Sequence, residues 1–362
     1  MNALFVFMMK SENFNFLYEK YNTKPVVLLK LLNKLLIKAS KKVVHYTECQ
    51  YIRLIFQNLS MHNLKTNFDK FLSIAKSFHS NAIDEDGNFQ FYPNLPKMSD
   101  CEIIALALTG ESIGIDSENY FWEKLKTDYS ANFPDLIDRS RFNRRRKRLS
   151  THIHNLNKGI ADELNENEDA YIVDSIPIPV CQIAREKRSR ICKETFENAP
   201  DKGFSAVSKS YYYGYKLHLI TSVRGVFQSM DMTKASIHDI HYLSDVKYSG
   251  LNNCVLLGDK GYLSKTHQLD LFTCCNINLA TPSRNNQHVK EHYPFIFKRF
   301  RKRIETIFSQ LCDQFMLKRN YAKSFAGLSV RILSKITALT LLQYINFQNN
   351  KPINHIKFAL AC

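Results

Sequence analysis

The segment YYYGYKLHLITSV at residues 211–223 alternates between two kinds of side chain with a period of two. One face of the predicted strand carries aromatic and leucine side chains, at Tyr213, Tyr215, Leu217 and Leu219. Lys216 and His218 lie on the other face. Arg224 and Gly225 form a tight turn, and residues 226–232 return as a second strand. The pattern predicts an antiparallel hairpin with one face against a core.

Further strands and helices are predicted on both sides of this hairpin. Residues 171–174 and 254–259 are short apolar runs typical of buried strands, and residues 277–280 form another. Helices are expected from about residue 237, at 263–272 and at 295–318. The order β-β-β-α-β-α-β-α predicts an α/β, ribonuclease-H-like domain. Its mixed five-stranded sheet has three antiparallel strands that continue into two parallel ones, with helices on the faces.

The chain before this domain is predicted to be helical. Ser99 and Glu102 have the spacing of a capping box, and an apolar stripe follows at Ile103, Ile104, Ala107 and Leu108. We therefore divide the chain into four parts: a basic apolar extension at 1–60, a helical DNA-binding region at 61–165, the catalytic domain at 166–345, and a C-terminal tail at 346–362. The status of the extension stays open. We expect it to be dispensable, and an inactive protein started at Met61 would contradict this.

The balance of charge points to a polyanionic partner. Fifty Lys and Arg residues against 34 Asp and Glu give a formal net charge of +16, which favours nucleic acid. A membrane is not expected, because the most apolar stretch, residues 25–36, is short and contains Lys30 and Lys34. The nine cysteines show neither zinc-ligand nor disulfide spacing, and no signal peptide is recognised, so we expect a cytoplasmic, nucleoid-associated protein.

Three acidic residues lie at positions in the predicted fold where their carboxylates can come together. Asp174 is expected to end the first strand, Asp259 to end the fourth, and Glu305 to lie at the edge of the apolar stripe of the last long helix. The first and fourth strands are neighbours in this fold, so the two aspartates would project side by side. Each acid alone also has a structural interpretation: an Asx turn at Asp174, a simple turn at Asp259, and an i,i+4 pair with Arg301 at Glu305.

Together the three acids favour metal-dependent phosphodiester chemistry. Oxygen-rich sites suit Mg²⁺ or Mn²⁺, and two ions about 3.5–4 Å apart can activate an attacking oxygen and stabilise a leaving one. Without a cation the carboxylates would repel one another and raise one another's pKa. We therefore predict two divalent ions at this site.

Five blocks of the sequence resemble DDE transposases of bacterial insertion sequences. They are DSIPIPV at 174–180, YGYKLH at 213–218, ASIHD at 235–239, GDKGY at 258–262 and RKRIETIFSQ at 301–310. The similarity runs collinearly over about residues 95–345. It implies Asp174, Asp259 and Glu305 as catalytic and metal-binding residues, double-stranded DNA with terminal inverted repeats as substrate, and a homo-oligomeric synaptic complex. Lys298 and Cys312 replace a tyrosine and a lysine in the signature of a related group, so we do not carry over that group's end processing.

Basic residues near these blocks are predicted to contact DNA phosphates. They are Arg144, Arg145, Arg146, Lys147 and Arg148 in a basic helix, Arg188 and Arg190 in a loop, Lys216 and His218 on the strand, and Lys260, Arg301, Lys302 and Arg303 beside the acids. A solvated helix face is the alternative for the helical runs, and a structural role is the alternative for His218. The segment ASIHD is interpreted as the start of a helix, with Asp239 at its N-terminus.

The predicted reaction has two steps. Water attacks the phosphate at the end of the element and frees a 3′-hydroxyl, which then attacks target DNA. Two alternatives remain: a ribonuclease-H-like nuclease that cuts without joining, and an inactive or recruited DNA-binding protein derived from a transposase. Strand-transfer products would exclude both.

Overall fold

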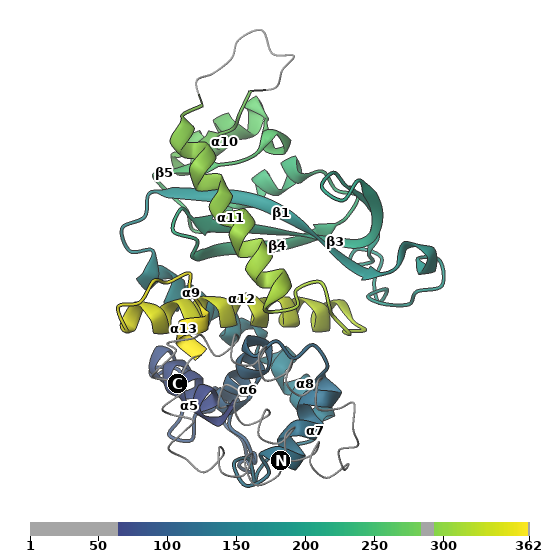
Figure 1. Cartoon of the computed structure of the whole chain (residues 1–362), viewed down its shortest axis with the longest axis vertical. Helices are drawn as coiled ribbons and strands as arrows, with labels where there is room; N and C mark the ends of the chain where they lie inside the picture. Colours follow the sequence, from purple (N-terminus) through teal and green to yellow (C-terminus); the bar gives the residue numbers. More distant parts are fainter. Residues whose placement is uncertain (1–63, 284–292, 361–362) are drawn as a thin grey trace, which may run out of the picture. The chain divides into compact units, whose positions relative to one another are not determined.

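A computed structural model describes residues 64–283 and 293–360 of the chain (Figure 1). The predicted extension at 1–60 lies outside these residues. Residues 62–362 form one compact unit, in which strands follow helices. The helices of the first part are α5 (Leu64–Phe78), α6 (Asp100–Ser112), α7 (Glu118–Asp128), α8 (Arg139–Arg148) and α9 (Ser150–Leu164).

The capping box predicted at the start of α6 is present. The backbone N–H of Glu102 donates to the Ser99 hydroxyl at 3.2 Å, and the Ser99 N–H donates to the Glu102 carboxylate at 2.7 Å. Each pair satisfies a backbone donor that the first helical turn would leave without a partner. Both Ile103 and Ile104 are fully buried, so this cap anchors a core helix.

One mixed sheet follows the helical part. Its strands are β1 (Ala170–Cys181), β2 (Asp201–Ser205), β3 (Ser210–Ser222), β4 (Phe227–Lys234), β5 (Cys254–Leu257) and β6 (Ile277–Ala280). The order is β2-β3-β1-β5-β6, with β4 also paired to β3. Strands β1, β3 and β4 are antiparallel, whereas β1, β5 and β6 are parallel. This arrangement confirms the predicted mixed α/β, ribonuclease-H-like fold, with β2 as an additional strand.

The end of the first strand was predicted wrongly. Strand β1 does not end at Asp174 but continues through Pro177 and Pro179 to Cys181, paired with β3. Strand β5 pairs with β1 only as far as Ile172, so beyond that point no strand of the described residues lies on the other edge of β1. Prolines at alternate positions are tolerated there, because an unpaired edge needs no N–H donor.

The three helices predicted after the hairpin differ from the structure in type or in their ends. The helix expected from residue 237 is a 3₁₀ helix at Asp239–Ser244. The helix expected at 263–272 is α10 (Lys265–Cys275), and the last predicted helix is α11 (Phe295–Asp313), which ends five residues before the predicted Lys318.

Apolar side chains of the two sheet faces enter different clusters. Leu217 and Leu219 belong to a large cluster shared with α5–α9, α11 and α12. Val173 and Ile220 belong to a smaller cluster on the other face, with the 3₁₀ helix at Asp239–Ser244 and α10. The predicted alternation along β3 is thereby confirmed, and it separates Lys216 and His218 from the leucines.

Helix α12 (Phe325–Gln348) runs between the helical part and the sheet and contacts α6, α9 and β4 (Figure 1). It is the one described helix long and apolar enough to cross a membrane, but 78% of its most apolar window is buried inside the protein. Burial on all sides by neighbouring helices is typical of a core helix. After it, the short helix α13 (Lys357–Leu360) packs back with Ala359 and Leu360 buried.

Candidate active site

Strands β1 and β5 bring two of the predicted acids together. Their last matched pair is Ile172 with Leu257. Asp174 and Asp259 each lie two residues beyond that pair, on adjacent parallel strands. Their carboxylates are close enough that the charge of Asp259 raises the pKa of Asp174. The sheet therefore places two carboxylates at one edge, as the sequence predicts.

Asp174 is half-buried, and its charge is disfavoured. Burial, followed by the charges of Asp259 and Asp239, raises its pKa to about 7. The backbone N–H of Ser175 donates to Oδ1 of Asp174 at 2.8 Å and, with the charge of Arg301, opposes this rise. A carboxyl group that titrates near neutrality beside other acids is typical of a functional site, because a bound cation would offset the repulsion.

Asp259 caps a short turn. Its Oδ1 accepts the backbone N–H of Gly261 at 2.7 Å, which fixes the carboxylate at the start of the 3₁₀ helix Lys260–Tyr262. A Cβ on Gly261 would lie 2.8 Å from Oδ1 of Asp259 and 3.7 Å from Oδ2 of Asp239. Because any side chain would crowd these oxygens, the glycine keeps space open between two carboxylates.

Asp239 is a third acid at this edge, although its place in the sequence predicted only a role at the start of a helix. Its Oδ1 accepts the Ser175 hydroxyl at 3.2 Å and the Lys216 ammonium at 3.0 Å, while Oδ2 faces Gly261. Its negative charge also raises the pKa of Asp174. The block ASIHD at 235–239 was a usable signal, but its Asp was attributed to helix capping.

Glu305 is exposed on α11. The buried residues Ile304, Ile307, Phe308 and Leu311 define the core side of this helix. Arg301, one helical turn before Glu305 on the same side, is close enough to Asp174 that its charge lowers the pKa of that carboxyl group. By helix geometry Glu305 therefore shares a flank of α11 with Arg301, and its place beside the aspartates stays a prediction.

The donor atoms suit a hard divalent cation, although the three predicted acids are not assembled as one group. Within residues 64–283 and 293–360, no three His, Cys, Asp or Glu side chains lie together as a ready-made metal site. Asp174 supplies oxygens from within strand β1, and Asp259 supplies them from the turn that follows β5. Oxygen ligands are those that Mg²⁺ and Mn²⁺ prefer. The fit to a divalent cation therefore rests on these two aspartates. A third ligand, predicted to be Glu305, would have to move toward them.

His218 was predicted to contact DNA. Its side chain is fully buried, so this prediction is wrong. Its Nε2 lies 2.9 Å from the Thr233 hydroxyl, and its ring stacks on Tyr242 with centroids 4.6 Å apart. Burial lowers its pKa to about 4, so the ring is neutral at pH 7. Lys216 is also engaged inside the protein, since its ammonium donates to the Ile237 carbonyl at 2.6 Å and to Asp239.

Two arginines of the predicted DNA-binding helix form ion pairs inside the protein instead. Arg146 is 4% exposed and pairs with Glu118 at 2.6 Å. Arg145 pairs with the buried Asp100 at 2.6 Å. Helix α8 packs against α6, and Arg145 and Arg146 lie on the packed side of α8. Their guanidinium groups therefore pair with carboxylates and are not free to bind DNA. We therefore remove both from the proposed DNA-binding set.

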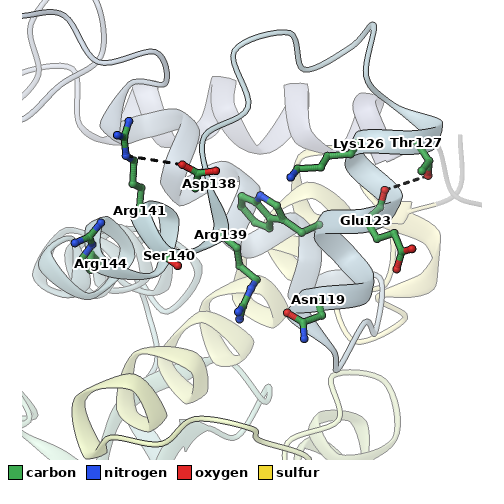
Figure 2. Close-up of a pocket in the computed structure, with 10 residues that line it drawn as sticks. Asn119, Glu123, Lys126, Thr127, Asp138, Arg139, Ser140, Arg141 and Arg144 are labelled. Carbon is green, nitrogen blue, oxygen red and sulfur yellow. Dashed lines mark hydrogen bonds and ion pairs between the residues drawn. The ribbon is translucent and has the colours of Figure 1, made fainter.

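The remaining predicted basic residues lie at or near the surface. Those that are exposed are Arg144, Lys147, Arg148, Arg188, Arg190, Lys260 and Lys302, whereas Arg301 and Arg303 are half-buried. Arg144 also lines an open pocket of about 640 Å³ between α7 and α8, together with Arg139, Arg141 and Lys126 (Figure 2). Asp138 lies 4.0 Å from Arg141 at the same pocket, which partly offsets the positive charge.

Comparison with known proteins agrees with this geometry. Residues 164–324 match the family model described as "Transposase DDE domain". The matched segment contains β1 to α11, and with them Asp174, Asp239, Asp259 and Glu305. No curated protein matches the chain. The part of the chain that carries the aspartates is thus similar to the DDE domain of transposases.

Proposed function

We propose that this chain is the transposase of a bacterial insertion sequence, which cuts the ends of its DNA element and joins them to target DNA. One observation carries the proposal. Asp174 and Asp259 lie at equivalent positions on adjacent strands, two residues past the same matched pair, within the segment similar to a DDE domain. A general DNA-binding protein would not need acids gathered beside basic surface residues, because they repel phosphate.

Asp174, Asp259 and Glu305 are the residues proposed to hold divalent cations, Mg²⁺ or Mn²⁺ and two in number. Such cations would stabilise the charge that develops on the scissile phosphate and on the attacking and leaving oxygens. Glu305 is exposed, and its flexible side chain lies on the Arg301 side of α11, so it can turn toward the aspartates when DNA and cations are present.

The remaining residues of the site are proposed to position the acids and the DNA. The Gly261 N–H orients Asp259, and the Lys216 ammonium orients Asp239. Arg301 and Lys302 precede Glu305 on α11 and would hold phosphates on either side of the scissile bond. The pKa of Asp174 shows that Arg301 already acts at the aspartates.

Double-stranded DNA, as terminal inverted repeats and as target, is the proposed partner. Its contacts would be Arg144, Lys147, Arg148, Arg188, Arg190, Lys260, Arg301, Lys302 and Arg303, which are at least partly exposed to solvent. Joining two ends in concert requires a homo-oligomer in the synaptic complex. We place this reaction in the bacterial cytoplasm, on the nucleoid.

The test uses labelled DNA ends taken from inverted repeats in the sequence that flanks the gene. Cleavage and joining are measured with Mg²⁺ and with Ca²⁺, for the intact protein, Asp259→Asn and Glu305→Gln. Asp313→Asn is the matched control, because Asp313 is an exposed carboxylate at the end of the same helix α11. Mg²⁺-dependent joining that survives in the control and is abolished in both other variants supports the proposal.

Two outcomes would favour the alternatives. Cutting without strand transfer, on ends that carry a free 3′-hydroxyl, would indicate a nuclease. Equal DNA binding by all four proteins with no cleavage would indicate a DNA-binding protein in which the acids have no catalytic role.

A further inference from the structure

A second pocket, of about 540 Å³, lies where the turn between β3 and β4 meets the segment after α12. Four basic side chains line it: Arg224, Arg303, Lys351 and His355. No acidic residue is among the described residues that line it. We call this the C-terminal basic pocket. Its composition selects for an anion.

The pocket is fixed by amide hydrogen bonds between distant segments. The Asn354 side chain donates to the Arg224 carbonyl at 2.8 Å and accepts from Gln343 of α12 at 3.1 Å. Gln343 also donates to the Gly225 carbonyl at 2.8 Å, and Gln310 of α11 donates to the Asn354 carbonyl at 2.8 Å. The C-terminal segment is thereby tied to the β3–β4 turn and to α11, so the basic groups are held in one place.

Close packing at the turn brings Arg303 into the pocket. Gly225 has a φ of 87°, which favours glycine, and a Cβ at this position would lie 2.9 Å from Cδ of Arg303. The stem of Arg303 therefore lies against the turn, and its guanidinium group lines the pocket beside Arg224.

The basic groups of the pocket are only partly neutralised. Arg224 has a carboxylate 3.5 Å away, at Glu168. Across the described residues, no carboxylate forms an ion pair with Arg303 or Lys351. Both are therefore available to an anion from outside, and Arg and Lys are the usual protein contacts to phosphate oxygens.

The pocket lies on the other flank of α11 from the aspartates. Successive residues of a helix are rotated by about 100°, so Arg303 is rotated by about 200° from both Arg301 and Glu305. Arg301 acts on Asp174, whereas Arg303 and Gln310 face the C-terminal segment. An anion in the pocket is therefore not the phosphate that is cut.

We infer that the C-terminal basic pocket binds backbone phosphates of a stretch of DNA outside the cleaved bond, and so holds a second part of the duplex against α11. This inference rests on the proposed function for the identity of the polyanion. Free inorganic phosphate presents the same chemistry, and the experiment below separates the two sources.

The test compares two lysines of the C-terminal segment. Lys351→Glu changes the pocket, whereas Lys357→Glu makes the same charge change at an exposed lysine that does not line it. Affinity for a duplex that extends well beyond the cleavage point is measured by fluorescence anisotropy over a range of salt concentrations. Arg303→Gln, whose folding is checked by thermal denaturation, is the second pocket variant.

We expect Lys351→Glu to weaken binding of the long duplex about tenfold more than Lys357→Glu does. The slope of log Kd against log salt should fall by about 0.9 for each phosphate that the variant no longer neutralises. A short duplex confined to the cleavage point should show no difference between the two variants, because it does not reach the pocket.

Equal affinities of Lys351→Glu and Lys357→Glu for the long duplex would overturn the inference. So would inorganic phosphate binding, measured by calorimetry, that disappears in Lys351→Glu while DNA affinity matches the control. These readouts do not depend on cleavage. A protein that binds DNA through the pocket but never cuts would contradict the proposed function and leave the pocket established.

Discussion

The ammonium group of Lys216 lies 3.0 Å from Oδ1 of Asp239, and the Ser175 hydroxyl donates to the same oxygen at 3.2 Å. Lys216 is on β3 and Ser175 is on β1, so two strands hold one carboxylate beside Asp174. Oδ2 of Asp239 is left facing Gly261 and the Asp259 turn. The pair thus decides which oxygen of Asp239 reaches the candidate active site.

Replacing Lys216 should therefore destabilise the protein. Lys216→Met leaves the half-buried Asp239 without its cationic partner, and we expect the free energy of unfolding to fall by about 1–3 kcal/mol at pH 8. The double variant Lys216→Met with Asp239→Asn should recover most of this decrease. Urea denaturation of the intact protein, the two single variants and the double variant measures the coupling free energy between Lys216 and Asp239. Additive effects on the free energy of unfolding would show that the pair does not contribute to stability.

Asp174 should make stability depend on pH. Its pKa is raised to about 7 in the folded protein, against 3.8 ordinarily, so the folded state binds more protons than the unfolded state between these values. Stability from this group is complete below about pH 4 and is lost as the pH rises through about 7. In metal-free protein, Asp174→Asn should therefore be the more stable at pH 8, by about 1.4 kcal/mol for each pKa unit.

Thermal denaturation of both proteins at pH 5 and pH 8, in the presence of a chelator, measures this difference. His218 has the opposite pH dependence, because its pKa is lowered to about 4, but it is present in both proteins and cancels. A gap between the two melting temperatures that does not widen from pH 5 to pH 8 would contradict the assignment to Asp174.

Gly261 should be required for activity more than for stability. A Cβ there would lie 2.8 Å from Oδ1 of Asp259, so Gly261→Ala must displace the carboxylate or its turn. We expect DNA cleavage to fall more than tenfold, with a melting temperature within a few degrees of the intact protein. Thr266→Ala, at an exposed position of helix α10, is the control. Full cleavage by Gly261→Ala would show that the carboxylate does not need this geometry.

Glu111 should be among the most sensitive positions for folding. Its carboxylate is 3% exposed and pairs with Lys335 and, at 3.2 Å, with Arg331 of α12. Burial alone would raise its pKa, but Lys335, Arg331 and Arg146 hold it below the ordinary value. Glu111→Gln leaves the buried Lys335 without a carboxylate partner and leaves Arg331 and Arg146 with Glu118 alone.

We expect Glu111→Gln to lower the free energy of unfolding by about 3–5 kcal/mol. Glu123→Gln, at an exposed position on α7, should change it by less than about 0.5 kcal/mol. Guanidinium denaturation followed by circular dichroism distinguishes the two. Similar midpoints for both variants would contradict a structural role for the buried network.

The fold could be predicted from the sequence where periodicity is clear. The alternation at 211–223 identified β3 and its two faces, and the spacing of the apolar runs gave the strand order. The continuation of strand β1 past Asp174 was missed, because prolines are uncommon in strands and are tolerated here along the unpaired edge of the described sheet. Helix α12 was not among the predicted elements, since a helix buried on all sides has no apolar stripe to detect.

The candidate site was predictable in part for a similar reason. Asp174 and Asp259 were found because each follows an apolar run that the sequence shows directly. The roles of Arg146 and Asp239 depend on partners far along the chain, Glu118 for the first and Lys216 for the second. A run of charges cannot show which members point inward, because that depends on the surface that packs against the helix.

The buried pairs of Glu111 with Arg331 and Lys335 have a consequence for how such a protein can diversify. Glu111 belongs to the helical part, whereas both cations belong to α12, beyond the segment similar to the DDE domain. Exchange of residues 64–164 for those of another protein would leave two buried cations without a counter-charge. We therefore expect a chimera with a foreign helical part to fold only if that part supplies a carboxylate opposite Arg331 and Lys335.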